Sequence, residues 1–140
     1  MNVVFLSPHF PPNFWLFCQG LRQAGANPLG IGDAPWEALR PELQGALTEY
    51  YRVPDMHLHE ERVRGLGYLT FRHGKLDRID SMSEYWLESE ARLRDDFNIP
   101  GLRTSDMARI KRKSAMKRIF AEAGIAVARG RICPTPDDLR

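Results

Sequence analysis

The first apolar segment of the chain, Val3-Val4-Phe5-Leu6, constrains the fold more than any other part of the sequence. Consecutive apolar residues leave no polar face, which is typical of a β-strand buried on both sides in a parallel sheet. The segment that follows contains Pro8, Pro11 and Pro12, and it can continue neither a strand nor a helix. The sequence therefore predicts a buried strand at residues 3–7 with an irregular loop at its carboxyl end.

Strand-like and helix-like segments alternate through residues 1–100. This alternation is typical of a parallel sheet with right-handed crossovers. We therefore predict an α/β fold: a four-stranded parallel Rossmann-like sheet flanked by helices, followed by a helix-strand extension. The expected strand order is 3-2-1-4, which places a crevice at the carboxyl ends of the first and fourth strands. The expected strands are residues 3–7, 28–32, 49–53 and 76–80, and the expected helices are residues 14–24, 36–47, 57–73 and 83–97.

The loop after the first strand argues against one class of ligand. Rossmann dinucleotide sites need glycines in this turn, because the backbone must approach the pyrophosphate closely. The turn here, SPHFPPNF, contains no glycine, and Phe10 with the prolines would block that approach, so NAD and FAD are not expected. His9 is the polar group of this loop that could face a ligand in the crevice, which makes it a candidate substrate-binding residue. The alternative is a histidine that is merely exposed.

A basic segment, residues 105–124, has helical periodicity and precedes an expected strand at residues 125–133. At 100° per residue its apolar side chains form one stripe, and Lys113 is aligned with that stripe. Burying an unpaired ammonium group is costly, so an anionic ligand could be the partner of Lys113. The stripe consists of Met116, Ile119, Phe120 and Ala123, and the cations of the segment are Arg109, Lys111, Arg112, Lys113, Lys117 and Arg118.

The position of Lys113 also carries a resemblance to a known family. Lys113 lies eleven positions before Gly124 in the segment Gly-Ile-Ala-Val, and this register resembles the start of the first ATP-binding lobe of ATP-grasp ligases. Ala126 stands where the family usually has a proline. Upstream, Glu84 follows the fourth expected strand and residues 99–101 form an Ile-Pro-Gly turn, as in the domain that precedes the ATP-grasp fold. The chain thus resembles the carbamoyl-phosphate-synthase and biotin-carboxylase-like branch.

The resemblance implies a domain division and site residues. Residues 1–100 would form the pre-ATP-grasp domain, and residues 101–140 would form the start of the nucleotide-binding lobe. Lys113 would contact a phosphate of ATP and Glu84 would contact the substrate, although Glu84 is also explained as an acid favoured by the dipole at the start of a helix. The parent enzyme would use ATP and Mg²⁺. The family's metal ligands would lie beyond Arg140, so this chain alone is expected to hold no cofactor and no catalytic residue.

The implied function is that of a ligase fragment. The parent would activate a small-molecule carboxylate with ATP as an acylphosphate and transfer the acyl group to a nucleophile, while this chain alone would be inactive. Residues 135–140 resemble the first turn of a helix, so we expect the chain to be the front portion of a longer protein. Its expected partners are the remaining ATP-grasp lobes of the parent. A homodimer through residues 104–140 is a further expectation, because the apolar stripe would otherwise lack a cover.

Two other functions stay open from the residues alone. One is a non-enzymatic, flavodoxin-like interaction module, and the other is nucleic-acid binding through the basic residues 109–118. A net charge of only +2, from 20 basic and 18 acidic residues, argues against nucleic acid as a partner. His57 and His59 resemble a metal-binding pair, but no second ligand pair is evident, so an exposed helix start is the preferred interpretation.

The cysteine count and the lack of a long apolar run bear on the cellular location of the protein. Cys18 and Cys133 are too few for a disulfide framework, and we expect both to be reduced. The sequence has no signal-peptide pattern and no apolar run of about 18 residues. We therefore expect a cytoplasmic protein without a membrane partner.

Overall fold

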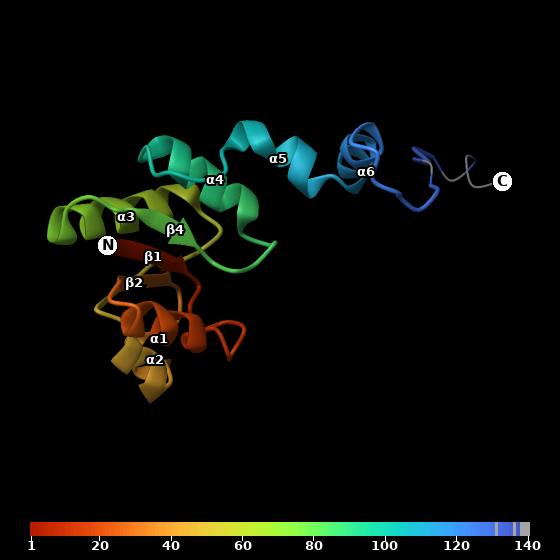
Figure 1. The fold of residues 1–140 in the computed structure, drawn as a ribbon. Coiled ribbons are helices and arrows are strands. Elements are labelled where there is room, and N and C mark those ends of the chain that lie inside the picture. Colours follow the sequence, from red (N-terminus) through yellow and green to blue (C-terminus); the bar gives the residue numbers. More distant parts are fainter. Residues whose placement is uncertain (131, 136, 138–140) are drawn as a thin grey trace. The chain divides into compact units, whose positions relative to one another are not determined.

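The computed structural model describes residues 1–130, 132–135 and 137, and the chain divides into two compact units (Figure 1). The first unit is Met1–Thr104 and the second is Ser105–Arg140. The first unit thus continues past Pro100, where the sequence analysis placed its end. Arg103 and Thr104 belong to it because both bind Asp95: Arg103 Nη1 donates to Asp95 Oδ1 at 3.3 Å, and Thr104 N donates to Asp95 Oδ2 at 3.1 Å.

The first unit is built on a four-stranded sheet in the order β3-β2-β1-β4, and every neighbouring pair of strands is parallel. In the middle of the sheet, Val4 pairs with Leu29 on one side and with Ile79 on the other, and all three are buried. The predicted α/β class and the predicted strand order are therefore confirmed. The strands are β1 (Asn2–Leu6), β2 (Asn27–Gly32), β3 (Glu49–Arg52) and β4 (Arg78–Asp80).

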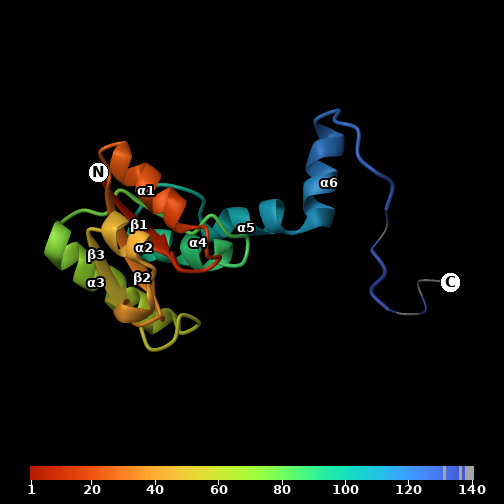
Figure 2. The same cartoon turned by 90° about the horizontal axis from the view of Figure 1, so that it is seen from below.

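Helices cover both faces of this sheet (Figures 1 and 2). On one face α1 (Trp15–Gln23) and α2 (Pro41–Ala46) lie side by side and enclose a small core that includes Phe5 and Cys18. On the other face α3 (His59–His73) and α4 (Leu87–Asp96) enclose the larger core, which includes Leu66 and Leu93. Burial raises the pKa of the free Cys18 thiol to about 12, so this thiol is protonated and unreactive.

Three helices of the first unit differ from the expected ones. The helix expected at residues 36–47 begins only at Pro41, as α2, because a helix needs no N–H from its first residues. A separate 3₁₀ turn, Trp36–Ala38, precedes it. α4 begins at Leu87 rather than at Ser83, since the backbone before it makes a turn in which the N–H of Trp86 donates to the Ser83 carbonyl at 3.2 Å. α3 begins at His59, two residues later than expected.

α3 approaches the sheet most closely at Gly65. A Cβ atom at this position would lie 3.0 Å from the side chain of Ile31 and 3.1 Å from that of Tyr51. A Cβ atom at Gly67, on the exposed side of the same helix, would meet nothing within 4 Å. Both glycines weaken the helix, but only Gly65 is required by packing.

The second unit does not have the expected helix-strand form. The single helix expected at residues 105–124 is divided into α5 (Thr104–Lys111) and α6 (Lys113–Glu122), because Arg112 is extended, with φ −86° and ψ 109°. Gly124, at φ +73°, follows the end of α6 as expected. The strand expected at 125–133 is absent from residues 125–130 and 132–133, and residue 131 lies outside the described residues. A strand needs a neighbour for its backbone hydrogen bonds, and the described part of this unit offers none.

No helix within the described ranges is long and apolar enough to cross a bilayer.

The two glycines of α3 provide a matched test of the packing. Gly65→Leu should lower the free energy of unfolding by about 1–3 kcal/mol, because the added atoms must displace Ile31 or Tyr51. Gly67→Leu should raise it by roughly 0.5–1 kcal/mol, because leucine favours the helix and the space is open. Urea denaturation followed by circular dichroism measures both changes. Equal effects of the two substitutions would contradict the close approach of α3 to the sheet.

Candidate ligand-binding crevice

The loops that follow the four strands enclose a crevice of ≈ 510 Å³ at the carboxyl edge of the sheet. β1 lies between β2 and β4, and the chain leads from β1 to β2 on one side but crosses from β3 to β4 on the other, which makes this edge the switch point of the fold. Each loop contributes to the walls. The lining residues are Ser7, His9, Phe10 and Pro11 after β1, Asp33 after β2, Met56 and His57 after β3, and Ser83, Tyr85 and Trp86 after β4.

His9 and Asp33 form the polar wall of the crevice. The imidazole Nε2 lies 3.3 Å from Asp33 Oδ1, while Nδ1 is buried and has no hydrogen-bond partner. Burial lowers the pKa of His9, and the nearby carboxylate only partly offsets this effect. A proton on Nδ1 would have no acceptor, so the neutral tautomer with its proton on Nε2 is favoured. His9 therefore faces Asp33 as a neutral donor at physiological pH.

Gly32, the last residue of β2, leaves the space beside which the imidazole of His9 packs. A Cβ atom at Gly32 would lie 2.5 Å from the hydroxyl of Tyr50 and 3.0 Å from His9 Nδ1. The Tyr50 hydroxyl is itself fixed, because it donates a hydrogen bond to the carbonyl of Ala34 at 2.9 Å. Any side chain at this position would push the polar wall outward, so glycine is required here for close packing.

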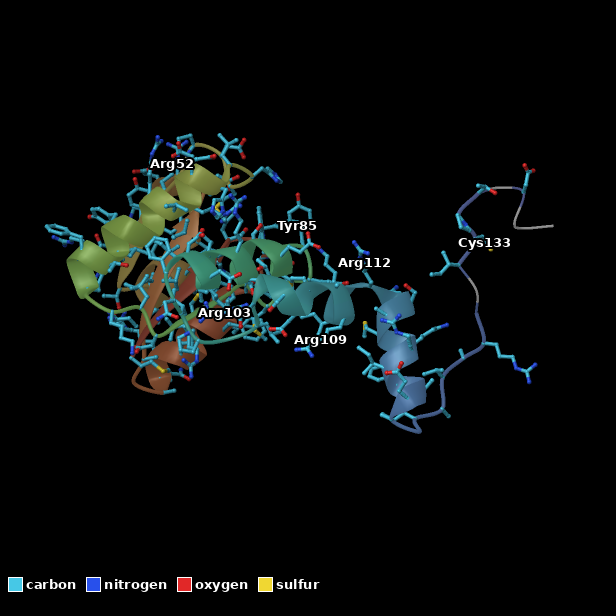
Figure 3. The ribbon with its side chains drawn as sticks, turned by 90° about the horizontal axis from the view of Figure 1, so that it is seen from above. Arg52, Tyr85, Arg103, Arg109, Arg112 and Cys133 are labelled. Carbon is cyan, nitrogen blue, oxygen red and sulfur yellow. The ribbon has the colours of Figure 1, made fainter. Side chains whose placement is uncertain are left out.

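The opposite wall is aromatic. The ring centroids of Tyr85 and Trp86 are 4.8 Å apart, and that of Trp86 lies 5.5 Å from that of His57. The Tyr85 hydroxyl lies 3.2 Å from His57 Nδ1, which links the loops after β3 and β4. Figure 3 shows Tyr85 projecting from the turn that precedes α4. This wall therefore presents ring faces and edges, and the Tyr85 hydroxyl and His57 Nδ1 are already paired to each other.

A buried arginine fixes the aromatic wall from behind. Arg62 is only 4% exposed, and its Nη1 donates to the Met56 carbonyl. Its guanidinium carbon lies 5.7 Å from the ring centroid of Trp86. Burial lowers the pKa of Arg62, and Nε has no hydrogen-bond partner. This arginine holds the loop after β3 and the ring of Trp86 in one arrangement.

The backbone beside the crevice is also unusual. Ser7 and Met82 have φ values of +51° and +55°, which few residues other than glycine adopt. Ser7 directly follows β1, and Met82 follows β4 by two residues. Asp80 secures the second turn, because its Oδ1 accepts hydrogen bonds from the N–H of Ser81 at 2.8 Å and of Met82 at 2.9 Å. Such backbone geometry concentrates at functional sites, which supports the assignment of the crevice.

A second hollow of ≈ 550 Å³ lies on the other side of the Met82–Glu84 turn. Its deepest polar groups are Glu90 and Arg94, which are buried and joined by a 2.9 Å ion pair. Burial raises the pKa of Glu90, although a hydrogen bond from Ser81 and the ion pair oppose this effect. Because these groups satisfy one another, this hollow has less to offer a ligand than the crevice.

The two predicted substrate-binding residues do not face one hollow. His9 lines the crevice, whereas Glu84 is exposed and lines the second hollow, with Ser83 lining both. Their roles in substrate binding stay predictions. The sequence analysis missed Asp33, Tyr85 and Trp86. The last two could have been found, because Tyr85-Trp86 lies in the segment after the fourth strand, at the expected switch point.

Lys113 lies at the start of α6 in the second unit and is exposed. It lines a hollow of ≈ 350 Å³ with Ser114 and Lys117, while Met116 and Phe120 line a different one. α6 has no buried residue, so the argument that Lys113 belongs to a buried face is wrong. Two lysines and a hydroxyl still form an anion-compatible surface, and phosphate contact by Lys113 stays a prediction.

The basic residues of the second unit do not share one continuous helix. Arg109 pairs with Asp106 on α5, and Arg118 Nε lies 3.9 Å from Glu122 on α6. Arg112 occupies the extended break between the helices, and Figure 3 labels both Arg109 and Arg112. The nucleic-acid alternative assumed one uninterrupted basic helix, and the structure does not provide it.

The His57–Glu61 segment does not assemble a metal site. His57 contacts Tyr85, while His59 Nε2 lies 2.7 Å from Asp96. Within the part of the chain that the structure describes, no three His, Cys, Asp or Glu side chains are grouped so that they could hold a metal ion.

The fold is shared with solved ligase structures. The chain superposes on an L-amino acid ligase from Bacillus licheniformis with a TM-score of 0.65 at 16% identity, over 90% of this chain and 31% of that chain. On a phosphoribosylglycinamide synthetase from Anaerococcus prevotii the TM-score is 0.66 at 15% identity, over 99% of this chain and 33% of that chain. No family model and no curated protein sequence matches the chain.

These likenesses concern the fold. They support the resemblance to ATP-grasp ligases at that level and do not distinguish a branch of the family. The chain spans about a third of the length of each of the two solved structures.

The buried ion pair beside the crevice yields a test of the turn after β4. Arg94→Met should lower the free energy of unfolding by about 3–5 kcal/mol, because Glu90 would stay buried without its cation. The double variant with Glu90→Met should recover much of this loss, since neither charge then remains. Arg92→Met, on the exposed face of the same helix, should change it by less than about 0.5 kcal/mol.

The free energy of unfolding of the Arg94→Met variant should depend on pH, and the pKa of Glu90 sets the direction of this dependence. Loss of the arginine raises the already elevated pKa of Glu90 further, so the folded state takes up a proton where the unfolded state does not. The loss in free energy of unfolding that Arg94→Met causes should therefore become smaller as the pH falls from about 7 to about 5. Urea titrations at the two pH values measure it. A deficit that grows on acidification would contradict the assignment of the buried charge.

Proposed function

We propose that this chain forms the N-terminal, substrate-binding part of an ATP-dependent ligase. The observation that carries the proposal is the crevice at the switch point of a parallel sheet whose fold is shared with an L-amino acid ligase and a phosphoribosylglycinamide synthetase. The resemblance around Lys113 favours the carbamoyl-phosphate-synthase and biotin-carboxylase-like branch. A cytoplasmic location is part of the same proposal.

The proposed reaction has two steps. A carboxylate oxygen of the substrate attacks the γ-phosphorus of ATP, which forms an acylphosphate and releases ADP. The nucleophile then attacks the acyl carbon, and phosphate leaves with the oxygen that belonged to the carboxylate. In such chemistry Mg²⁺ neutralises the phosphate charge. The described residues offer no metal cluster, so its ligands would come from other parts of the parent enzyme.

Residues of this chain would bind and orient the reactants. In the first unit the crevice would hold a substrate between its polar and aromatic walls. In the second unit Lys113 would contact a phosphate of ATP, supported by the nearby hydroxyl of Ser114. Lys117 already donates to the Ala128 carbonyl at 3.1 Å, so Lys113 is the better candidate of the two lysines.

An isotope experiment on the longer protein that contains this sequence tests the mechanism. With a carboxylate labelled with ¹⁸O and unlabelled ATP, one labelled oxygen should appear in the released phosphate, which mass spectrometry detects. Lys113→Ala should raise the KM for ATP by about tenfold or more, since it removes a charge-assisted phosphate contact. Lys111→Ala, two positions earlier, should change it far less. Unlabelled phosphate at full turnover would contradict the acylphosphate mechanism.

We also propose that the exposed apolar side chains of the second unit are covered by another part of the parent enzyme or by a second copy of the chain. These side chains are Ile119, Phe120, Ile125, Val127 and Ile132. Burying their remaining exposed surface would be favourable in proportion to the apolar area removed from water. The 140-residue chain alone should therefore self-associate. Light scattering should give a mass that increases with concentration, and Phe120→Ser should reduce the increase. A constant monomer mass would contradict the proposal.

A further inference from the structure

The charged side chains that line the crevice determine which sign of charge a ligand can carry there. Apart from its two histidines, Asp33 is the only ionisable charge among the described lining residues, and its side chain is 46% exposed. Arg52 lies nearby, but its Nε donates to the backbone carbonyl of Asp33 at 3.1 Å rather than to the carboxylate. The carboxylate is therefore left with His9 as its polar neighbour, at 3.3 Å.

His9 does not neutralise this carboxylate. Its Nδ1 is buried without an acceptor, so a second proton on the ring would be unsatisfied, and burial of the ring acts in the same direction. The polar wall consequently carries one negative charge. A carboxylate or phosphate ligand in the crevice would meet this charge with no lysine or arginine among the described lining residues.

The aromatic side chains of the crevice favour the same sign of ligand. Phe10 and Tyr85 are 66% and 63% exposed at its rim, and Trp86 lies deeper. Ring faces attract cations, most strongly when the cation has lost part of its hydration. Phe10, Pro11 and Met56 add apolar surface for the uncharged body of a ligand.

Two nearby cations oppose a cationic ligand. Arg52 donates to the carbonyl of Asp33 but does not line the crevice. The guanidinium of Arg62 lies behind Trp86 and does not line the crevice. Its field is partly balanced by Asp55 and Glu60. Asp33, which lines the crevice directly, is thus the dominant charge for a ligand inside it.

From these observations we infer that the crevice binds an organic ammonium ion whose charged nitrogen faces Asp33 and whose apolar or aromatic body lies against Tyr85 and Trp86. The volume of ≈ 510 Å³ suits a small molecule of this kind. The inference rests on the proposed function in taking the crevice as a substrate site, and it names the substrate class as an amine. In the proposed ligase, the crevice would hold the amine-bearing reactant.

Three probes that share one aromatic ring and differ in charge test the inference on the full 140-residue chain without ATP. They are phenethylamine, the neutral 2-phenylethanol and the anionic 3-phenylpropionate. Calorimetry should give a Kd on the order of 1 mM for the amine, and weaker binding by about tenfold for the carboxylate. Fluorescence should respond to the amine, and the response should be lost in Trp86→Phe, which leaves Trp15 and Trp36 unchanged.

Matched variants test whether the charged nitrogen of the ligand lies beside Asp33. Asp33→Asn keeps the size of the side chain and should weaken phenethylamine by about tenfold, with little effect on 2-phenylethanol. Glu37→Gln removes the same charge from an exposed helical turn that does not line the crevice, and it should leave both affinities unchanged. Tyr85→Ala, at an exposed position that the fold tolerates, should weaken the amine more than the alcohol.

Three outcomes would overturn the inference: 3-phenylpropionate binding as tightly as phenethylamine, an unchanged amine affinity in Asp33→Asn, or no binding of any probe. The readouts are independent of ATP. A ligase that passes the isotope test while the amine fails to bind would retain the proposed function and lose this inference. Selective amine binding without ATP-dependent turnover would do the reverse.

Discussion

The burial of β1 on both faces is the constraint on which the first unit depends. Val3, Val4, Phe5 and Leu6 divide their side chains between two cores, so helices must cover each face of the sheet. β1 pairs in parallel with β2 on one side and β4 on the other, which brings every carboxyl end to one edge. The loops after the strands must then meet there. The crevice is thus a consequence of where an apolar tetrapeptide lies in the sheet.

Buried charges at this edge have a cost that the fold must offset. Glu90 and Arg94 are buried together beside the turn after β4, and Arg62 is buried without a carboxylate partner behind Trp86. Apolar residues of the same size would often be as stable or more stable at such positions. These charged side chains instead fix the positions of the backbone segments that they bind. Arg94 Nη2 donates to the Ile79 carbonyl at 2.6 Å and so ties α4 to β4. Arg62 donates to the Met56 carbonyl and so secures the loop after β3, which lines the crevice.

The fold was predictable because its determinants are local. Short apolar runs marked the strands, and the handedness of crossovers restricted their order. The errors occurred where tertiary context decides. A strand at 125–130 needs a neighbour that the sequence cannot display, and the extended backbone of Arg112 divides a helix that periodicity alone would continue. His9 was found because the loop after a central strand must border the crevice. Asp33 and Arg62 were missed as site residues, because Asp33 contacts His9 and Arg62 contacts Trp86, which are far from them in the sequence.

The two units place different chemistry in different environments. The crevice combines a neutral imidazole, one carboxylate and aromatic rings, a combination that suits a cationic organic group and disfavours phosphate. The hollow at the start of α6 has the opposite character, with two lysines and a serine hydroxyl. A ligase must keep an amine nucleophile uncharged at the moment of attack, yet it can collect that amine as an ammonium ion. Asp33 is suited to the collecting step, because its carboxylate attracts the ammonium ion.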